Sequence, residues 1–159
     1  MKLSRDLLYS WGIAASLQLL GDTARKQGDY STAHSWLVES LSILKEIGDK
    51  REIVSLLDSF GYLSSVYLTP EYAPLLLASA DLLRKTINIP RAPISSCDFS
   101  YYTQIVRQKL GEDTYSRLWM EGQSITLEQA IEYALHSETA NSAEEPNLLS
   151  KSNEASVHS

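Results

Sequence analysis

A serine and a lysine three residues apart have the types and spacing of a catalytic pair. In the segment Ser42-Ile43-Leu44-Lys45, the lysine could activate the serine as a nucleophile for acyl transfer. The companion motifs of that arrangement, Ser-Asp-Asn and Lys-Thr-Gly, do not occur in the chain. Basic residues also recur forty residues before and after Lys45, as Arg5 and Lys85. This recurrence favours a solvated helix face over a catalytic pair.

The single cysteine offers a second set of groups. Cys97 could act as a nucleophile with His34 as its base, and Asp98 or Asp113 could orient the histidine. This arrangement requires side chains from separate elements to converge, and nothing in their spacing demands it. We therefore expect Cys97 to lie in a loop or to be partly buried.

Metal and nucleotide sites lack their usual motifs. The histidines are His34, His136 and His158, no two of them are four residues apart, and a lone cysteine cannot form a ligand pair. Gly111 lies in an isolated turn without the Gly-Lys-Ser ending of a phosphate-binding loop. We expect no metal, no cofactor and no enzymatic activity.

The composition is that of a helical globular protein. The 159 residues are 43% hydrophobic and 21% charged, and two Phe and seven Gly argue against a strand-rich fold. The net charge is −6, with no basic patch for nucleic acid or anionic lipid. No apolar run reaches the roughly 20 residues that cross a bilayer, and the start does not resemble a signal peptide. With one cysteine, these features predict a cytoplasmic protein.

A 40-residue period runs through the first part of the chain. Within each copy the apolar residues recur every three or four positions, which predicts pairs of amphipathic helices. The aligned positions are apolar or small in both copies: Ile13 with Ile53, Leu17 with Leu57, Leu20 with Phe60, Gly21 with Gly61, Ala33 with Ala73, and Leu37 with Leu77.

Signals for helix ends divide each copy into two helices. Gly28 can adopt the left-handed conformation that ends a helix, and Asp29 can cap the next one. In the second copy we expect Thr69 to be the cap and Pro70 to occupy the first helical position.

Small residues recur where paired helices would meet. A glycine inside a helix costs roughly 1 kcal/mol relative to alanine. Gly21 and Gly61 occupy the same repeat position, as do Ala33 and Ala73. We therefore expect these four residues to allow close approach of antiparallel helices, which a larger side chain would force apart.

The first copy resembles a known repeat family. Its pattern Leu17-x-x-Leu20-Gly21-x-x-Ala24-x-x-x-Gly28-Asp29-Tyr30-x-x-Ala33 is similar to the tetratricopeptide repeat. The second copy keeps Leu57, Phe60, Gly61 and Ala73 but has Ser64 for the alanine and Thr-Pro for Asp-Tyr. The resemblance implies an all-α fold over residues 1–97, a right-handed α-solenoid of helical hairpins with a period longer than the usual 34 residues.

Segments after the repeat narrow the resemblance. Residues 79–84, 88–90, 115–122 and 124–131 are similar to the ends of helical arrays in bacterial LuxR-type and related STAND-class regulators. In these regulators an ATPase module precedes the array. The resemblance implies the C-terminal end of a signalling or transcriptional regulator.

Residues 98–136 are expected to close the repeat stack. The pattern predicts helices over residues 99–110, 112–121 and 127–136, with glycines after the first and at the end of the second. Thr126 and Gln129 have the spacing of a capping box. Residues 137–159 are polar and predict a disordered tail.

The chain begins in the middle of a repeat. Leu3, Arg5 and Leu7 fall in columns that later belong to the second helix of a pair. Either a larger protein precedes this segment, or residues 3–11 merge into the first long helix. We favour a truncated or split-gene product.

Binding is the function that this architecture predicts. The first helix of each pair would line a concave face with exposed side chains, namely Gln18, Asp22, Arg25, Lys26, Asp58, Tyr62 and Ser65. An ordinary solvated face is equally consistent with these residues. We predict a non-catalytic protein–protein interaction or sensor module, whose partner is a protein, a peptide or the rest of a parent regulator. A free-standing peptide-binding adaptor is the alternative, and a hydrolase using Ser42 and Lys45 or Cys97 is third.

Overall fold

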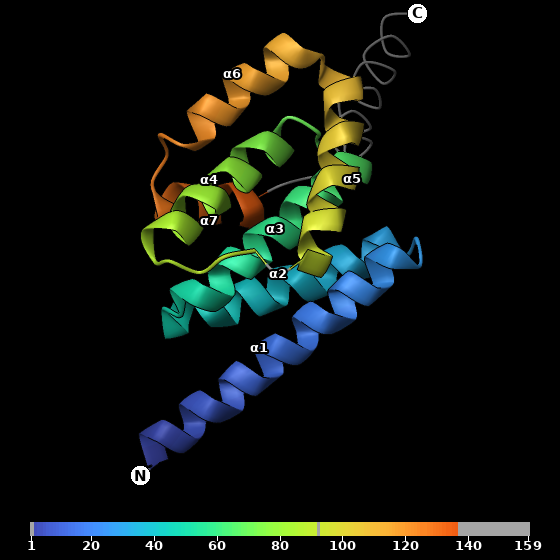
Figure 1. Ribbon diagram of the computed structural model, residues 1–159. Coiled ribbons are helices and arrows are strands. Elements are labelled where there is room, and N and C mark those ends of the chain that lie inside the picture. Colours follow the sequence, from blue (N-terminus) through green and yellow to red (C-terminus); the bar gives the residue numbers. More distant parts are fainter. Residues whose placement is uncertain (1, 92, 137–159) are drawn as a thin grey trace, which may run out of the picture.

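The computed structural model describes residues 2–91 and 93–136, and these form helices and short connections (Figure 1). The predicted all-α fold is confirmed. The predicted disordered tail, residues 137–159, lies outside the described residues. The helices are α1 (Lys2–Lys26), α2 (Tyr30–Ile47), α3 (Lys50–Val66), α4 (Tyr72–Thr86), α5 (Pro93–Leu110), α6 (Glu112–Gly122) and α7 (Leu127–Leu135). Over the described residues, no helix is both long enough and apolar enough to cross a membrane.

The first four helices form two consecutive antiparallel hairpins. α1 packs against α2 and α3 against α4, while α2 and α3 hold the two hairpins together. A buried hydrogen bond ties the first hairpin, because Ser40 Oγ donates to the Ala14 carbonyl oxygen over 2.7 Å. α3 lies at the centre of the molecule, and its residues from Leu56 to Ser65 are all buried.

Gly21 and Gly61 lie where the helices of each hairpin are closest. A Cβ atom at Gly21 would be 2.8 Å from Leu37 Cδ2, and one at Gly61 would be 2.6 Å from Leu77 Cγ. Both distances are too short for a methyl group. The two leucines are themselves 40 residues apart, so the same contact recurs at the same position of each hairpin.

Backbone geometry at the first hairpin turn agrees in part with the expected helix ends. Gly28 has a φ of 83°, in the left-handed region, as predicted. Asp29 precedes α2, but its side chain accepts no capping hydrogen bond. Side-chain capping occurs instead between the hairpins, where Asp49 accepts from the backbone N–H groups of Arg51 and Glu52.

The second hairpin begins later than expected. α4 starts at Tyr72, so Pro70 lies in the preceding turn and not at the first helical position. The turn is closed by backbone bonds from Tyr72 N–H to the Thr69 carbonyl and from Ala73 N–H to the Pro70 carbonyl. The predicted start at Pro70 is therefore wrong by two residues, because a tight turn consumes the residues that could have formed the first helical positions.

The C-terminal helices cover α3 and α4. α5 crosses α3, α6 packs along α4, and α7 contacts α2, α3 and α4 together. The ends of α5 and α6 are near their predicted positions, and the capping box of Thr126 and Gln129 is present in full. α5 begins at Pro93, six residues before the predicted start at residue 99.

The first helix extends well beyond its partner. Residues 3–11 continue into α1, which agrees with the second of the two alternatives for the start of the chain. Figure 1 shows these turns projecting away from the packed body. Leu7, Leu8 and Tyr9 are exposed there.

Candidate functional site

The residues predicted to line an exposed concave face are mostly buried. Lys26 is exposed and Asp22 is half-buried. The remaining five are buried, which makes the prediction of their exposure wrong: Gln18, Arg25, Asp58, Tyr62 and Ser65.

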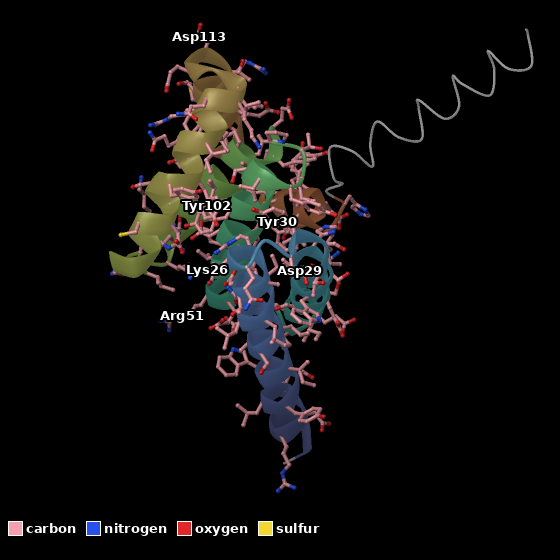
Figure 2. All side chains as sticks on the ribbon, turned by 90° about the vertical axis from the view of Figure 1, so that its right-hand side faces the viewer. Lys26, Asp29, Tyr30, Arg51, Tyr102 and Asp113 are labelled. Carbon is pink, nitrogen blue, oxygen red and sulfur yellow. The ribbon has the colours of Figure 1, made fainter. Side chains whose placement is uncertain are left out.

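Helix α5 covers part of this face. Its Tyr102 stacks on Tyr62 of α3, with ring centroids 4.9 Å apart and an angle of 20° between the ring planes. Near the other end of α5, Lys109 Nζ donates to the carbonyl oxygen of Ser65 over 2.6 Å. Figure 2 shows Tyr102 directed into the body of the molecule. The face that would receive a peptide in an open repeat is occupied by a helix of the same chain.

Arg25 connects α1 to this contact. Its guanidinium carbon lies 5.1 Å from the ring centroid of Tyr62 and 5.0 Å from that of Tyr102, within the range of a cation–π interaction. Asp22, one turn earlier, lies 3.4 Å from Arg25 Nη1. Burial raises the pKa of the Asp22 carboxyl, and the charge of Arg25 opposes that rise.

A second buried ion cluster joins α3 to the segment between α4 and α5. Asp58 Oδ2 accepts from Arg84 and, over 2.9 Å, from Arg91 Nη1. The same Arg91 nitrogen lies 3.1 Å from the hydroxyl of Tyr62. Burial raises the pKa of Asp58, and the two guanidinium groups oppose the rise. Burial, followed by the negative charge of Asp58, also raises the pKa of Tyr62.

These contacts give the predicted binding residues a structural role. Charged groups buried without partners are costly, and here Asp22 and Asp58 are paired with arginines. Gln18 adds a hydrogen bond between α1 and α3, because its Nε2 donates to Ser55 Oγ over 2.7 Å. The polar residues of the first helices therefore hold α1, α3 and α5 together.

The serine and lysine of the possible catalytic pair have other partners. Ser42 Oγ donates to the carbonyl oxygen of Val38, one turn earlier in its own helix. Lys45 Nζ donates to Glu132 Oε1 of α7 over 3.0 Å. The structure thus uses Lys45 in an exposed ion pair between α2 and α7.

The groups around Cys97 are spread over three helices. Cys97 is exposed near the start of α5, and Asp98 lies 4.0 Å from Lys26. His34 belongs to α2, where its ring meets that of Phe60 edge-on, and Asp113 is exposed in the first turn of α6. Figure 2 shows Asp113 at the far end of the molecule from α1. Among the described residues, no group of three His, Cys, Asp or Glu side chains could hold a metal ion.

An exposed apolar face on α1 is the feature that the sequence interpretation missed. Leu8 and Leu19 are 69% and 68% exposed, although both are leucines in the middle of a helix. Their signal is present in the sequence, because residues 8–21 contain no charged side chain. The residues that recur along this face at helical spacing are here called the α1 stripe: Leu8, Tyr9, Gly12, Ser16, Leu19 and Leu20.

The equivalent face of the second hairpin is covered by a helix. Ile13 and Leu20 are 38% and 45% exposed, whereas Ile53 and Phe60, forty residues later, are 2% and 0% exposed. The ring of His34 in α2 lies 6.3 Å from that of Phe60, centroid to centroid, so α2 provides part of this cover. In the second hairpin, the positions equivalent to Ile13 and Leu20 are therefore buried partly by a packed helix.

The opposite end of the molecule is closed. α4, the last helix of the two hairpins, is packed against α6 and α7. Gly122 of α6 is so close to α4 that a Cβ atom would lie 2.5 Å from the carbonyl oxygen of Leu75. The fold and the site together define an all-helical protein that is covered at one end and has an open apolar face at the other.

Comparisons with known proteins gave no match, whether with protein families, with curated sequences or with solved structures. The function is therefore inferred from the chain's own geometry.

Proposed function

We propose that this chain is a non-catalytic protein–protein contact module that uses the α1 stripe as its binding surface. The observation that carries the proposal is the difference between the two ends of the molecule. One end is covered by α6 and α7, while the other exposes Ile13, Leu19 and Leu20, whose equivalents in the next hairpin are buried. Contiguous exposed apolar surface of this kind is typical of an interaction site.

The repeat supports a more specific version of the proposal. Two hairpins with the same glycine–leucine contact at a 40-residue spacing are consistent with tetratricopeptide-like repeats. We propose that they belong to an α-solenoid of the type that ends bacterial LuxR-type and STAND-class regulators, acting in the cytoplasm in signalling. The closing helices α5 to α7 fit the terminal position in such an array, because an end repeat needs a cover.

The alternative function, a peptide-binding adaptor that uses its concave face, has less support. α5 already fills that face, and its ring stack and the Lys109 bond would have to break before a peptide could enter. Catalysis also has less support, because Ser42 and Lys45 bond to other groups and Cys97 has no partner base in the contacts described here.

Site-specific photocrosslinking tests the proposed surface. A photoreactive amino acid replaces Leu19 in the full chain, and the matched control carries it in place of Met120 of α6, which is 69% exposed. We expect discrete crosslinked protein species from position 19 and none from position 120. The position-19 species should disappear when Tyr9→Lys is added, since a charge would then enter the same surface.

Two results would contradict the proposal. One is equal crosslinking from positions 19 and 120, which would mean that the stripe is an ordinary surface. The other is saturable hydrolase activity that is lost on Ser42→Ala or Cys97→Ala, which would assign the chain to an enzyme class.

A further inference from the structure

The α1 stripe has a symmetric distribution of large and small side chains. Leu8 and Tyr9 lie at one end and Leu19 and Leu20 at the other, with Gly12 and Ser16 between them. In a helix, residues eleven positions apart lie on almost the same line, because eleven residues complete about three turns. Leu8 and Leu19 therefore form one edge of the stripe, and Tyr9 and Leu20 form the other.

The middle of the stripe is open. A Cβ atom at Gly12 would have no neighbour within 4 Å, and the shallow groove at this point is lined by Leu8, Tyr9, Gly12, Ile13, Ser16 and Leu17. Small residues flanked by large ones allow two helices to approach closely at the centre while the large side chains interlock at both ends. The surface thus has the form of half of a helix–helix contact.

We infer that the α1 stripe binds the α1 stripe of a second copy of this chain, in an antiparallel, two-fold symmetric dimer. This inference rests on the proposed function and names the partner. The two-fold operation places Leu8 against Leu19 of the other copy, Tyr9 against Leu20, and Gly12 near Ser16. Each pair consists of two residues from the same edge of the stripe. One antiparallel arrangement of the two helices therefore forms the contacts of both edges.

The near absence of charge along the stripe and the projection of the first turns of α1 also favour this pairing. Asp22 is the only charged residue between Leu8 and Thr23, and it is directed toward Arg25. No charged group has to lose its hydration in the middle of the interface. The first turns of α1 project away from the packed body, which leaves them accessible to the α1 helix of a second copy (Figure 2).

Head-to-tail association does not compete with this arrangement. It would need the outer face of α4 to receive α1 of the next copy, in the way that α2 receives α3. That face is already packed against α6 and α7. Within residues 2–91 and 93–136, the face of α4 that would continue the array is therefore closed to the stripe, whereas a self-complementary patch closes as a dimer.

Sedimentation equilibrium of the full chain tests the dimer. With increasing protein concentration, the mass should rise from the 17.8 kDa of one chain to twice that value and no further. Leu8→Lys and Leu19→Glu, made singly, should each weaken association about tenfold or more, because each places a charge opposite a leucine. The double variant should recover most of the association, since the introduced charges then face each other across the interface.

Gly12→Leu distinguishes a specific dimer of α1 helices from non-specific hydrophobic association. The substitution adds exposed apolar area and removes a helix glycine, and nothing in the fold obstructs it. A close antiparallel contact predicts weaker association, whereas non-specific adhesion predicts stronger association. Met120→Lys is the matched control and should leave association unchanged, because Met120 is as exposed as Leu8 but lies on α6.

Three results would overturn the dimer: a monomer at all concentrations, tighter association on Gly12→Leu, or no recovery in the double variant. A monomeric chain that still crosslinks a different protein through position 19 would refute the second copy and leave the contact function standing. If the chain is monomeric in sedimentation and position 19 also gives no specific crosslink, the proposed contact function is refuted as well.

Discussion

His34 is a titratable group held in an apolar environment. Its ring meets Phe60 edge-on, its Nε2 atom is buried without a hydrogen-bond partner, and burial lowers the pKa of the imidazole below its ordinary value of 6.5. Above pH 6.5 the imidazole is neutral in both the folded and the unfolded chain, and its contribution to stability is fully present. As the pH falls below 6.5, the unfolded chain takes up a proton that the folded protein resists.

The free energy of unfolding should therefore decrease as the pH falls through 6.5, and His34→Gln should remove this part of the decrease. Urea denaturation of both proteins on either side of pH 6.5 measures the difference. Burial raises the pKa of Asp22 and Asp58, which gives a pH dependence of opposite sign at lower pH. Asp22 and Asp58 are present in both proteins, so their contribution cancels when the unsubstituted protein is compared with His34→Gln. An equal decrease in both proteins would contradict the assignment to His34.

Single polar residues misled the sequence interpretation for a physical reason. Asp58 and Tyr62 would be exposed on an isolated helix, but Arg84 of α4, Arg91 of the segment after α4 and Tyr102 of α5 contact them in the interior. One signal could have revealed this. α3 has large apolar residues around its whole circumference, including Leu56, Leu57 and Tyr62, and such a helix is buried on all sides.

At the scale of helix pairs, Gly61 tests the close contact between α3 and α4. Gly61→Ala should lower the free energy of unfolding by about 1–3 kcal/mol, because the added methyl group overlaps Leu77. This loss should exceed the gain of up to about 1 kcal/mol that alanine brings to a helix. Urea denaturation followed by circular dichroism measures the change.

Gly12→Ala is the matched control for this prediction. It makes the same substitution in a helix interior, but its Cβ atom meets nothing within 4 Å. At protein concentrations where the chain is monomeric, we expect a gain of up to about 1 kcal/mol in the free energy of unfolding. A gain in both variants would show that helix α4 moves away from α3 at no cost.

Most helix ends could be predicted, because they depend on local signals. Gly28, Gly111 and the capping box at Thr126 act through the backbone of neighbouring residues, and the sequence displays them directly. The position of α5 could not be predicted in the same way. It depends on contacts such as Lys109 with Ser65, which join residues 44 positions apart and leave no local pattern.

For the whole molecule, the first turns of α1 are expected to serve association and not stability. Residues 5–9 are exposed and lie beyond the reach of α2. Deleting residues 1–8 should change the free energy of unfolding of the monomer by no more than about 0.5 kcal/mol. The deletion also removes Leu8 from the stripe, so sedimentation should show weaker association. A large loss of stability at low protein concentration would contradict this separation of roles.

Helix α7 changes how the molecule opens. Arrays of hairpins contact only their neighbours, so they can fray one unit at a time. α7 touches α2, α3 and α4 together, and the pair of Lys45 and Glu132 joins residues 87 positions apart. Amide hydrogens of both hairpins should therefore exchange with solvent through one cooperative opening, while those of the overhanging turns of α1 exchange independently and much faster.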